Sequence, residues 1–471
     1  MKHLIITAFL LAIYLLAVPT SSSAQTIAGG YYHSLALKKD GTFWVWGGNF
    51  SGQLGNGTNT SRNTPVQLSS LTGIIVIAGG YGHSLALKND GTVWAWGDNY
   101  YGQLGNGNTN NSNVPVQVTS LTGIIAIAGG GYHSLALKNN GTVWAWGDNY
   151  YGQLGNGTNT DSNVPVQVSS LSGIIAIAGG YGHSLALKND GTLWAWGYNS
   201  SGQLGNGNTD NRNVPVQVTP LTGITAIASG EGYSLALKND GTVWAWGDNY
   251  YGQLGNGNTN NSNVPVQVTS LTSTVAIVGG GWHSLALKKD GSVWAWGDNY
   301  YGQLGNGTDT DSNVPVRVSS LSGIIAIAAG EGHSLAVKND GTLWAWGLNN
   351  YGQLGNGNTT SSNVPLQVNI NNLLPVEVEK TNTPDKFSLD QNYPNPFNPS
   401  TTIEFTIQHS SNVTLKVYNL LGQEVRTLVN GMKEAGTYRI NFDAKELSNG
   451  VYIYKLEAGT FTQARKMILM K

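Results

Sequence analysis

The chain contains no cysteine, and only 11% of its 471 residues are charged. Without cysteine there are neither disulfides nor thiolate metal ligands, so stability has to come from core burial alone. The net charge of −2 argues against a nucleic-acid partner, because phosphate binding requires clustered lysines and arginines. Glycine is abundant, at 64 residues, but it has no every-third-residue period, which excludes a collagen-like chain.

The start of the chain, residues 1–24, has the pattern of a signal peptide. Lys2 precedes an apolar run, and the small residues Ser22 and Ala24 stand where a cleavage site before Gln25 requires them. A membrane anchor is the alternative, but the run is short for a spanning helix and no basic flank follows it. We therefore expect an exported protein with no membrane span in the mature chain.

Residues 25–368 consist of seven copies of a 50-residue repeat. A histidine recurs in this period from His33 to His333, with Tyr233 in one place, together with a Trp-x-Trp pair. Each copy has four short strand-like runs, of which an Asn-Asp-Gly turn joins the second and third, and a proline marks the fourth as an edge strand. The pattern predicts an all-β fold, a seven-bladed β-propeller. A solenoid is the alternative, but it requires atypical capping repeats.

The recurrent aromatic and histidine residues are interpreted as scaffold. Trp144 and Trp146 lie two apart on one strand, so both are expected to pack between adjacent blades. The histidine is expected to hydrogen-bond the backbone of the preceding Gly-Gly turn, because one imidazole per blade does not converge into a tetrahedral metal site. Asp98 and its equivalents after Trp-Gly are interpreted as loop formers, with weak Ca²⁺ contact as the alternative.

No catalytic motif is recognisable, so we expect a protein that is not an enzyme and has no cofactor and no metal. Glu231 and Glu331 depart from the repeat pattern. Because these two lie two blades apart, a paired-carboxylate glycosidase is not favoured.

Three stretches of the repeat, namely Gly-x-x-His-Ser-Leu-Ala-Leu, Gly-Thr-Val-Trp-Ala-Trp-Gly-Asp-Asn and Tyr-Gly-Gln-Leu-Gly, resemble the regulator of chromosome condensation repeat family. The resemblance covers about three quarters of the chain and implies a seven-bladed propeller. The founding member of that family is a nucleotide exchange factor for a nuclear GTPase, so guanine nucleotide exchange is an alternative function. An exported chain would not meet a cytosolic GTPase, however, and exported bacterial members of the family resemble binding scaffolds.

Differences among the seven copies concentrate in two loops, the one before the histidine and the one after the second tryptophan. In an antiparallel meander both loops emerge on the same face, and tyrosine and tryptophan are favoured at binding interfaces. We therefore predict that an unidentified extracellular protein or glycan binds this face, with a polysaccharide-acting enzyme on the same face as the alternative. The candidate binding residues are Tyr31, Tyr32, Tyr81, Tyr101, Tyr132, Tyr151, Tyr181, Tyr198, Tyr251, Trp282, Tyr301 and Tyr351.

The 50-residue period ends at Val368, and residues 369–390 read as a linker rich in Asn, Thr, Pro and charge. Residues 391–471 contain six alternating runs, at 403–407, 413–418, 424–428, 437–442, 451–457 and 460–470, which predict an antiparallel β-sandwich.

This last segment resembles the type A C-terminal sorting domain of the type IX secretion system. The matching residues are Tyr393, Pro394, Asn395 and Pro396, the Leu-Gly-Gln-Glu-Val stretch that contains Gly422, and the Gly-Val-Tyr that begins at Gly450. The resemblance implies the type IX secretion machinery as a partner, and release from the cell or display on the outer-membrane surface.

Overall fold

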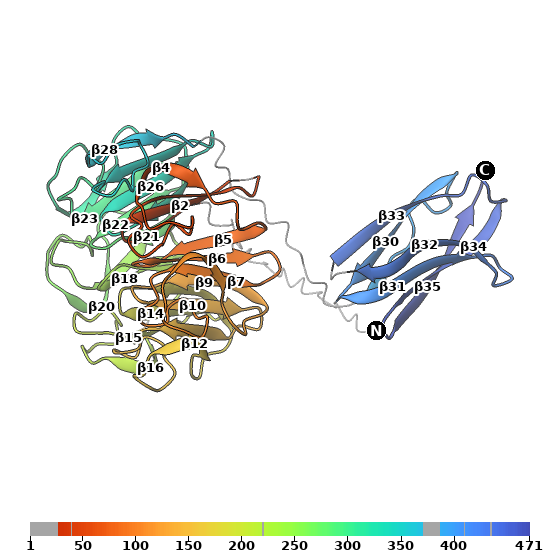
Figure 1. Ribbon diagram of the computed structural model, residues 1–471, viewed down its shortest axis with the longest axis horizontal. Coiled ribbons are helices and arrows are strands. Elements are labelled where there is room, and N and C mark those ends of the chain that lie inside the picture. The colour runs from red at the N-terminus through yellow and green to blue at the C-terminus, as the bar shows by residue number, and fades with distance from the viewer. Residues whose placement is uncertain (1–26, 39, 219–220, 371–386, 409, 434–435) are drawn as a thin grey trace, which may run out of the picture. The chain divides into compact units, whose positions relative to one another are not determined.

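The computed structural model describes residues 27–38, 40–218, 221–370, 387–408, 410–433 and 436–471. The predicted signal peptide, 1–24, and residues 371–386 of the predicted linker lie outside the described residues. The chain divides into two units, Met1–Glu377 and Val378–Lys471. The described parts of both units contain strands and no helix, so the all-β class is confirmed (Figure 1).

The first unit consists of seven four-stranded antiparallel sheets, one for each repeat. The innermost strands are β1 (Ile27–Gly29), β5 (Ile74–Gly79), β9 (Ile124–Gly129), β13 (Ile174–Gly179), β17 (Ile224–Ser229), β21 (Thr274–Gly279) and β25 (Ile324–Ala329). The second strands are β2 (His33–Leu37), β6 (His83–Lys88), β10 (His133–Lys138), β14 (His183–Lys188), β18 (Tyr233–Lys238), β22 (His283–Lys288) and β26 (His333–Lys338).

The third strands are β3 (Phe43–Gly47), β7 (Val93–Gly97), β11 (Val143–Gly147), β15 (Leu193–Gly197), β19 (Val243–Gly247), β23 (Val293–Gly297) and β27 (Leu343–Gly347). The outermost are β4 (Arg62–Gln67), β8 (Ser112–Gln117), β12 (Ser162–Gln167), β16 (Arg212–Gln217), β20 (Ser262–Gln267), β24 (Ser312–Arg317) and β28 (Ser362–Val368). Each outermost strand pairs only with the third strand and contains the proline, which cannot donate a backbone hydrogen bond, as predicted for an edge strand.

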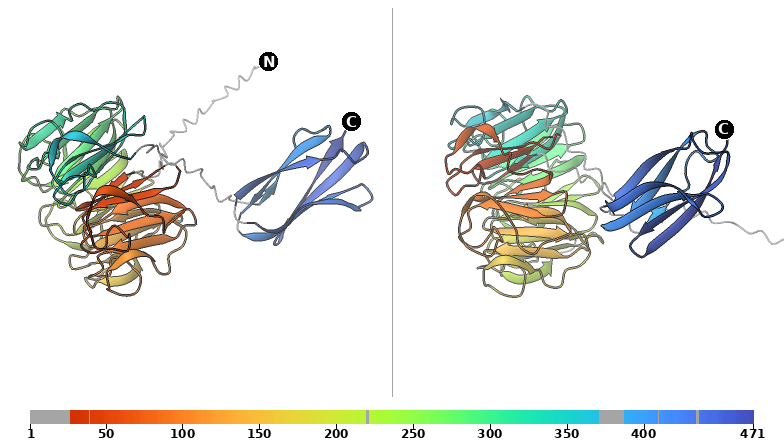
Figure 2. Two further views of the ribbon diagram at one scale, coloured as in Figure 1. Left: turned by 45° about the horizontal axis from the view of Figure 1, so that its top comes forward. Right: turned by 45° about the vertical axis from the view of Figure 1, so that its right-hand side comes forward.

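The blades follow one another in chain order, and β1 of the first blade contacts β25 and β26 of the last (Figure 2). Every blade is built from a single repeat, so the ring closes through contacts between the first and last blades rather than through a shared sheet. At the closure, Trp46 Nε1 donates to the carbonyl oxygen of Gln353 at 2.8 Å. The other six blades make the same contact with their predecessors, as Trp246 Nε1 does with Gln203 O at 2.8 Å.

The recurrent histidine joins adjacent blades, and its partner differs from the predicted one. The His333 ring packs against Gly330 of the Gly-Gly turn, but its Nε2 lies 2.9 Å from Ser34 Oγ of the next blade and does not hydrogen-bond the turn backbone. Ser34 Oγ donates its only proton to Gln353 O at 2.8 Å, so it accepts from His333 Nε2–H. In the fifth blade Tyr233 replaces this contact, because its hydroxyl donates to the carbonyl oxygen of His283 and accepts from Ser284 Oγ.

The two tryptophans of each pair differ in burial, although both were expected in the core. The second one, for example Trp146, is fully buried between blades. The first, Trp144, is only half-buried and lies beneath Lys138, whose Nζ is 5.4 Å from the ring centroid. Trp144 packs against the core between blades two and three, as predicted, but it is nearer the solvent-exposed hairpin, so the lysine stem and ammonium cover its remaining side.

The second unit is a two-layered antiparallel structure, as predicted. One sheet contains β29 (Ser388–Leu389), β30 (Ser400–Ile407) and β33 (Gly436–Asp443), and the other contains β32 (Glu424–Lys433), β31 (Ser411–Tyr418), β34 (Gly450–Ala458) and β35 (Phe461–Leu469), in those orders. Side chains of both sheets, such as Phe405 and Tyr454, share one buried core. Strand β29 belongs to this unit, although it falls within the predicted linker, 369–390.

Candidate functional site

Two kinds of loop emerge on one face of the propeller, which we call the mouth face. They join the first strand of a blade to the second, and the third to the fourth. Rings from the two loop types touch between blades, with Tyr101 and Tyr132 5.3 Å apart and Tyr32 and Tyr351 4.7 Å apart between centroids. The opposite face, here called the hairpin face, carries the Asp-Gly turns, where Asp90 Oδ1 accepts from Thr92 N at 2.9 Å.

A collar of small residues narrows the central channel at the mouth face. A β-carbon on Gly79 would lie 2.6 Å from the carbonyl oxygen of Gly29 in the neighbouring blade, so no side chain fits there. The residues that follow these glycines form backbone hydrogen bonds between adjacent blades; for example, Tyr31 N donates to Gly80 O at 3.1 Å. The residue that follows the collar in each blade is therefore held close to the channel axis.

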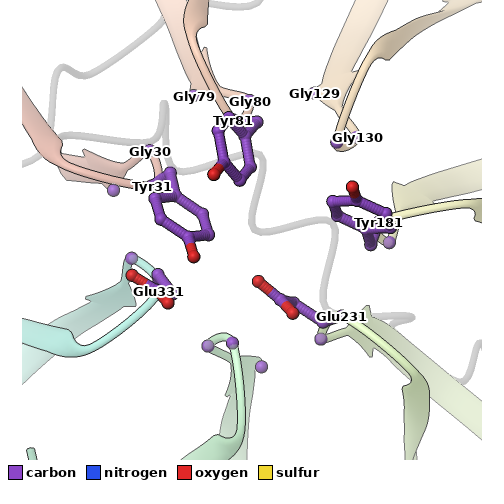
Figure 3. Close-up of a pocket in the computed structure, with 18 of the residues that line it drawn as sticks. Gly30, Tyr31, Gly79, Gly80, Tyr81, Gly129, Gly130, Tyr181, Glu231 and Glu331 are labelled. Atoms are coloured by element: carbon purple, nitrogen blue, oxygen red, sulfur yellow. The ribbon is translucent and has the colours of Figure 1, made fainter. Parts of the chain in front are cut away.

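These seven residues line a cavity of about 100 Å³. In chain order they are Tyr31, Tyr81, Gly131, Tyr181, Glu231, Gly281 and Glu331. The carboxylate of Glu231 and the hydroxyl of Tyr31 project toward the middle of the opening, with Glu331 beside Tyr31 (Figure 3). The part of the channel beyond the collar has a larger volume, about 460 Å³, and is lined mainly by Ala, Ile and Gly of the innermost strands.

Burial and nearby carboxylates govern the charge of this cavity. Burial, with the charges of Glu331 and Asp248 as smaller causes, raises the pKa of Glu231 to about 7. The pKa of Glu331 is also raised to about 7 by burial, against the lowering effect of a hydrogen bond from Tyr31. Burial and this bond to Glu331 raise the pKa of Tyr31 well above its usual range, so the phenol stays protonated.

The structure brings seven of the twelve predicted aromatic residues into one continuous cluster. Tyr31 and Tyr81 are 3.8 Å apart between ring centroids, Tyr81 and Tyr132 5.1 Å, and Tyr132 and Tyr181 5.7 Å. The cluster lies over blades one to four and reaches blade seven, and its predicted members are Tyr31, Tyr32, Tyr81, Tyr101, Tyr132, Tyr181 and Tyr351.

The other predicted residues form separate contacts. Tyr151 and Tyr198 are 4.4 Å apart, and Tyr251 and Trp282 are 5.9 Å apart. Tyr301 contacts Tyr300 at 4.8 Å.

Blades two, three, five and six have a Tyr-Tyr pair in the loop after the third strand. In each of these four pairs the more exposed ring is the first, which is not among the predicted site residues. Tyr250 is 74% exposed, for example, whereas Tyr251 is half-buried. The second ring turns inward because the glutamine two residues later holds its backbone: Tyr251 N donates to Gln253 Oε1 at 3.0 Å. The most exposed rings of the mouth face are therefore Tyr100, Tyr150, Tyr250 and Tyr300, each 73–74% exposed, and Phe50, 58% exposed, whereas the predicted residues Tyr181 and Tyr301 are 38% and 36% exposed.

Asp98 and its equivalents shape the loop after the third strand. Asp98 Oδ2 accepts from Gln103 Nε2 at 2.8 Å, and the same bond recurs at Asp148, Asp248 and Asp298. These hydrogen bonds lie within one loop and stabilise its conformation, as predicted for a loop-forming residue. Within the described ranges, no group of three or more His, Asp or Glu side chains is placed to hold a metal ion.

Glu231 and Glu331 are the residues that sequence reasoning set aside, on the ground that two blades separate them. At the collar the blades are at their narrowest, so side chains two blades apart enter the same cavity. Their position in the repeat could have indicated this cavity. Both occupy the first place after the collar, where the other blades have Tyr or Gly.

In the second unit, the sorting-motif residues lie at one end of the sandwich and in its turns. Tyr393 is 82% exposed, next to Asn392, which is buried and donates to Thr401 Oγ1 at 2.9 Å. Gly422 has a φ of +77° in the turn between β31 and β32, and Gly450 begins β34. No helix among the described residues has the length and apolarity needed to cross a membrane.

Family-level comparison matches residues 122–383 to the RCC1-like domain. Regulator of chromosome condensation (RCC1) repeats match at residues 40–87 and 90–137 and, in a second form, at 25–53 and 74–103. Residues 391–470 match the secretion system C-terminal sorting domain. The repeat resemblance and the sorting resemblance are both confirmed.

Individual proteins are similar over the propeller. A segment of 49 residues is 53% identical to the probable E3 ubiquitin-protein ligase HERC4 of Homo sapiens, which is 10% of this chain and only 5% of that protein's length. The structure of human WBSCR16 is 27% identical, with a TM-score of 0.63, over 70% of this chain and 94% of that chain. Prp20p of Saccharomyces cerevisiae, 24% identical, has a TM-score of 0.64 over 75% of this chain and 89% of that chain, which shows the shared fold.

Proposed function

The chain belongs to the RCC1-like domain family and ends in a secretion sorting domain, and from this premise we propose that it is a secreted, non-enzymatic binding protein. Its ligand, an extracellular protein or glycan, would bind the mouth face. The observation that carries this proposal is the continuous aromatic cluster from Tyr351 through Tyr32, Tyr31 and Tyr81 to Tyr181, which adjoins the two acidic residues of the cavity. Rigid aromatic side chains supply large contact areas at a small entropic cost.

The location of the protein supports an extracellular ligand. The sorting domain supports secretion or cell-surface localisation and implies the type IX secretion machinery as a partner. We propose that the mature protein remains displayed at the outer-membrane surface with the propeller available to ligands.

Hydrolysis of a polysaccharide is a second candidate, favoured by the two carboxyls that share one cavity. Each has a pKa raised to about 7, as a general acid requires. Against this candidate, the cavity of about 100 Å³ accommodates a few water molecules or one small polar group. This volume is well below the ~300 Å³ or more that is typical of small-molecule sites, and a glycosidase has to hold a sugar ring between its carboxyls.

The experiment compares two faces of the same protein. Full-length protein is screened on a glycan array and used to capture proteins from culture medium, and the strongest ligand is titrated. Trp282→Ala removes a mouth-face ring that lies outside the scaffold pairs and should weaken binding about thirtyfold, as expected for an anchor worth about 2 kcal/mol. Asp190→Ala on the hairpin face is the control and should leave affinity unchanged. If Asp190→Ala loses affinity and Trp282→Ala does not, the ligand binds the hairpin face and the proposal is wrong.

A further inference from the structure

The cavity at the mouth contains two carboxylates without a counter-charge. No lysine or arginine lines it. The ion pairs found among the described residues all lie elsewhere, mostly in the hairpin turns and in the second unit. Buried carboxylates are costly unless a cation or several hydrogen-bond donors compensate them. Glu331 receives one hydrogen bond, from Tyr31, and Glu231 faces the opening (Figure 3).

The repeat scaffold does not require these glutamates. Blades one, two and four have tyrosine at the same position, and blades three and six have glycine, with the same four-stranded fold. The two acidic residues therefore act against stability without a structural role in the blade. Departures of this kind from a local rule are typical of binding sites.

We propose that this cavity binds one primary ammonium group, such as the side-chain end of a lysine on a partner protein. The carboxylates of Glu231 and Glu331 would accept its hydrogen bonds, and the rings of Tyr31, Tyr81 and Tyr181 would form the remaining wall. A cation gains further stabilisation from the faces of aromatic rings. An ammonium fits better than a guanidinium, because the opening is small and an ammonium is a compact charge whose three donors can point to acceptors around the ring.

This inference deepens the proposed function, on which it rests for the macromolecule that carries the ammonium, but the cavity is tested with a small probe. The probe is lysine capped at both backbone ends, titrated into the full-length protein at pH 8 and followed by NMR. Capped norleucine, which has a similar chain without the charge, and capped arginine are the matched ligands. Capped lysine should bind at least tenfold more tightly than either.

Three substitutions test whether the capped lysine binds in this cavity. Glu231→Gln and Glu331→Gln should each weaken lysine binding at least tenfold while leaving the blade intact, because other blades fold without a carboxylate there. Asp210→Asn removes one exposed charge from a loop on the same face and should change nothing.

The pH dependence gives an independent readout. The titratable groups that face the two carboxyls are, besides each other, Asp248, Asp298, and the phenols Tyr31, Tyr32, Tyr181, Tyr233 and Tyr301. Ionisation of one carboxyl with a pKa of about 7 predicts binding about fourfold weaker at pH 6.5 than at pH 8.

Equal binding of lysine and norleucine, or lysine binding that both Gln variants retain, would overturn the inference. If capped arginine binds more tightly than capped lysine, the cavity is a guanidinium site and the ammonium inference is wrong. If the lysine probe fails while Trp282→Ala still weakens ligand binding about thirtyfold, the cavity inference is wrong and the proposed function stands. If Trp282→Ala also leaves the ligand affinity unchanged, both are wrong.

Discussion

Acidification from pH 7.5 to pH 5.5 should destabilise the propeller, because six fully buried histidines must remain neutral. Their side chains are 0% exposed, and burial lowers the pKa of each from 6.5 to about 3 or 4. Nε2 donates to a serine of the next blade, and the buried Nδ1 has no hydrogen-bond partner. A proton added at Nδ1 would thus place a charge in the core without an acceptor.

The sign and size follow from linkage. A group whose pKa is lowered by folding stabilises the protein above its unfolded pKa, and this stability is lost as the pH falls through 6.5 toward the folded value. At pH 5.5 each histidine costs about 1.4 kcal/mol, so six cost about 8 kcal/mol, comparable to the whole stability of many domains. Glu231 and Glu331 act in the opposite direction, because their raised pKa values favour the folded state as the pH falls from 8 toward 4.5. By the same arithmetic each carboxyl offsets at most about 2 kcal/mol at pH 5.5, and less because both side chains are partly exposed, so the histidine cost still exceeds this gain.

The assay is urea unfolding followed by tryptophan fluorescence at pH 7.5, 6.5 and 5.5. All 15 tryptophans lie in the propeller unit, so the signal is free of the second unit. His183→Tyr copies the arrangement that Tyr233 has in the fifth blade and should remove about one sixth of the histidine cost, about 1.4 kcal/mol at pH 5.5. A midpoint that stays constant or rises toward pH 5.5, or a variant with the full pH dependence, would refute the reasoning.

Two other perturbations test the scaffold and the sorting domain. Trp246→Ala should cost about 3–5 kcal/mol by opening a cavity between blades, whereas Tyr250→Ala, at a 74% exposed ring, should stay within about 0.5 kcal/mol in the same urea assay; similar losses for both would contradict the assignment of core and surface. Deletion of 391–471 should leave a folded propeller in the periplasm, as fractionation and immunoblotting would detect, and unchanged appearance outside the cell would contradict the sorting role.

The repeat made the blades predictable, because periodicity, turn residues and the edge proline all indicate the same four-stranded unit. Contacts between blades were harder to predict. The histidine contacts a serine 51 residues away, and nothing within one repeat indicates that partner. Glu231 and Glu331 illustrate the same limit, since their shared cavity depends on how narrow the closed ring is at the collar. The orientation of each Tyr-Tyr pair depended on one glutamine side chain, which spacing alone does not reveal.

The central claim is that ligands bind the mouth face, and hydrogen–deuterium exchange with and without the captured ligand tests it most directly. The account predicts slower exchange in the loops that contain Tyr31, Tyr81, Glu231, Trp282 and Glu331, with no change in the hairpins that contain Asp90 and Asp190. Protection confined to those hairpins or to the outermost strands, with the mouth loops exchanging as in the free protein, would contradict it.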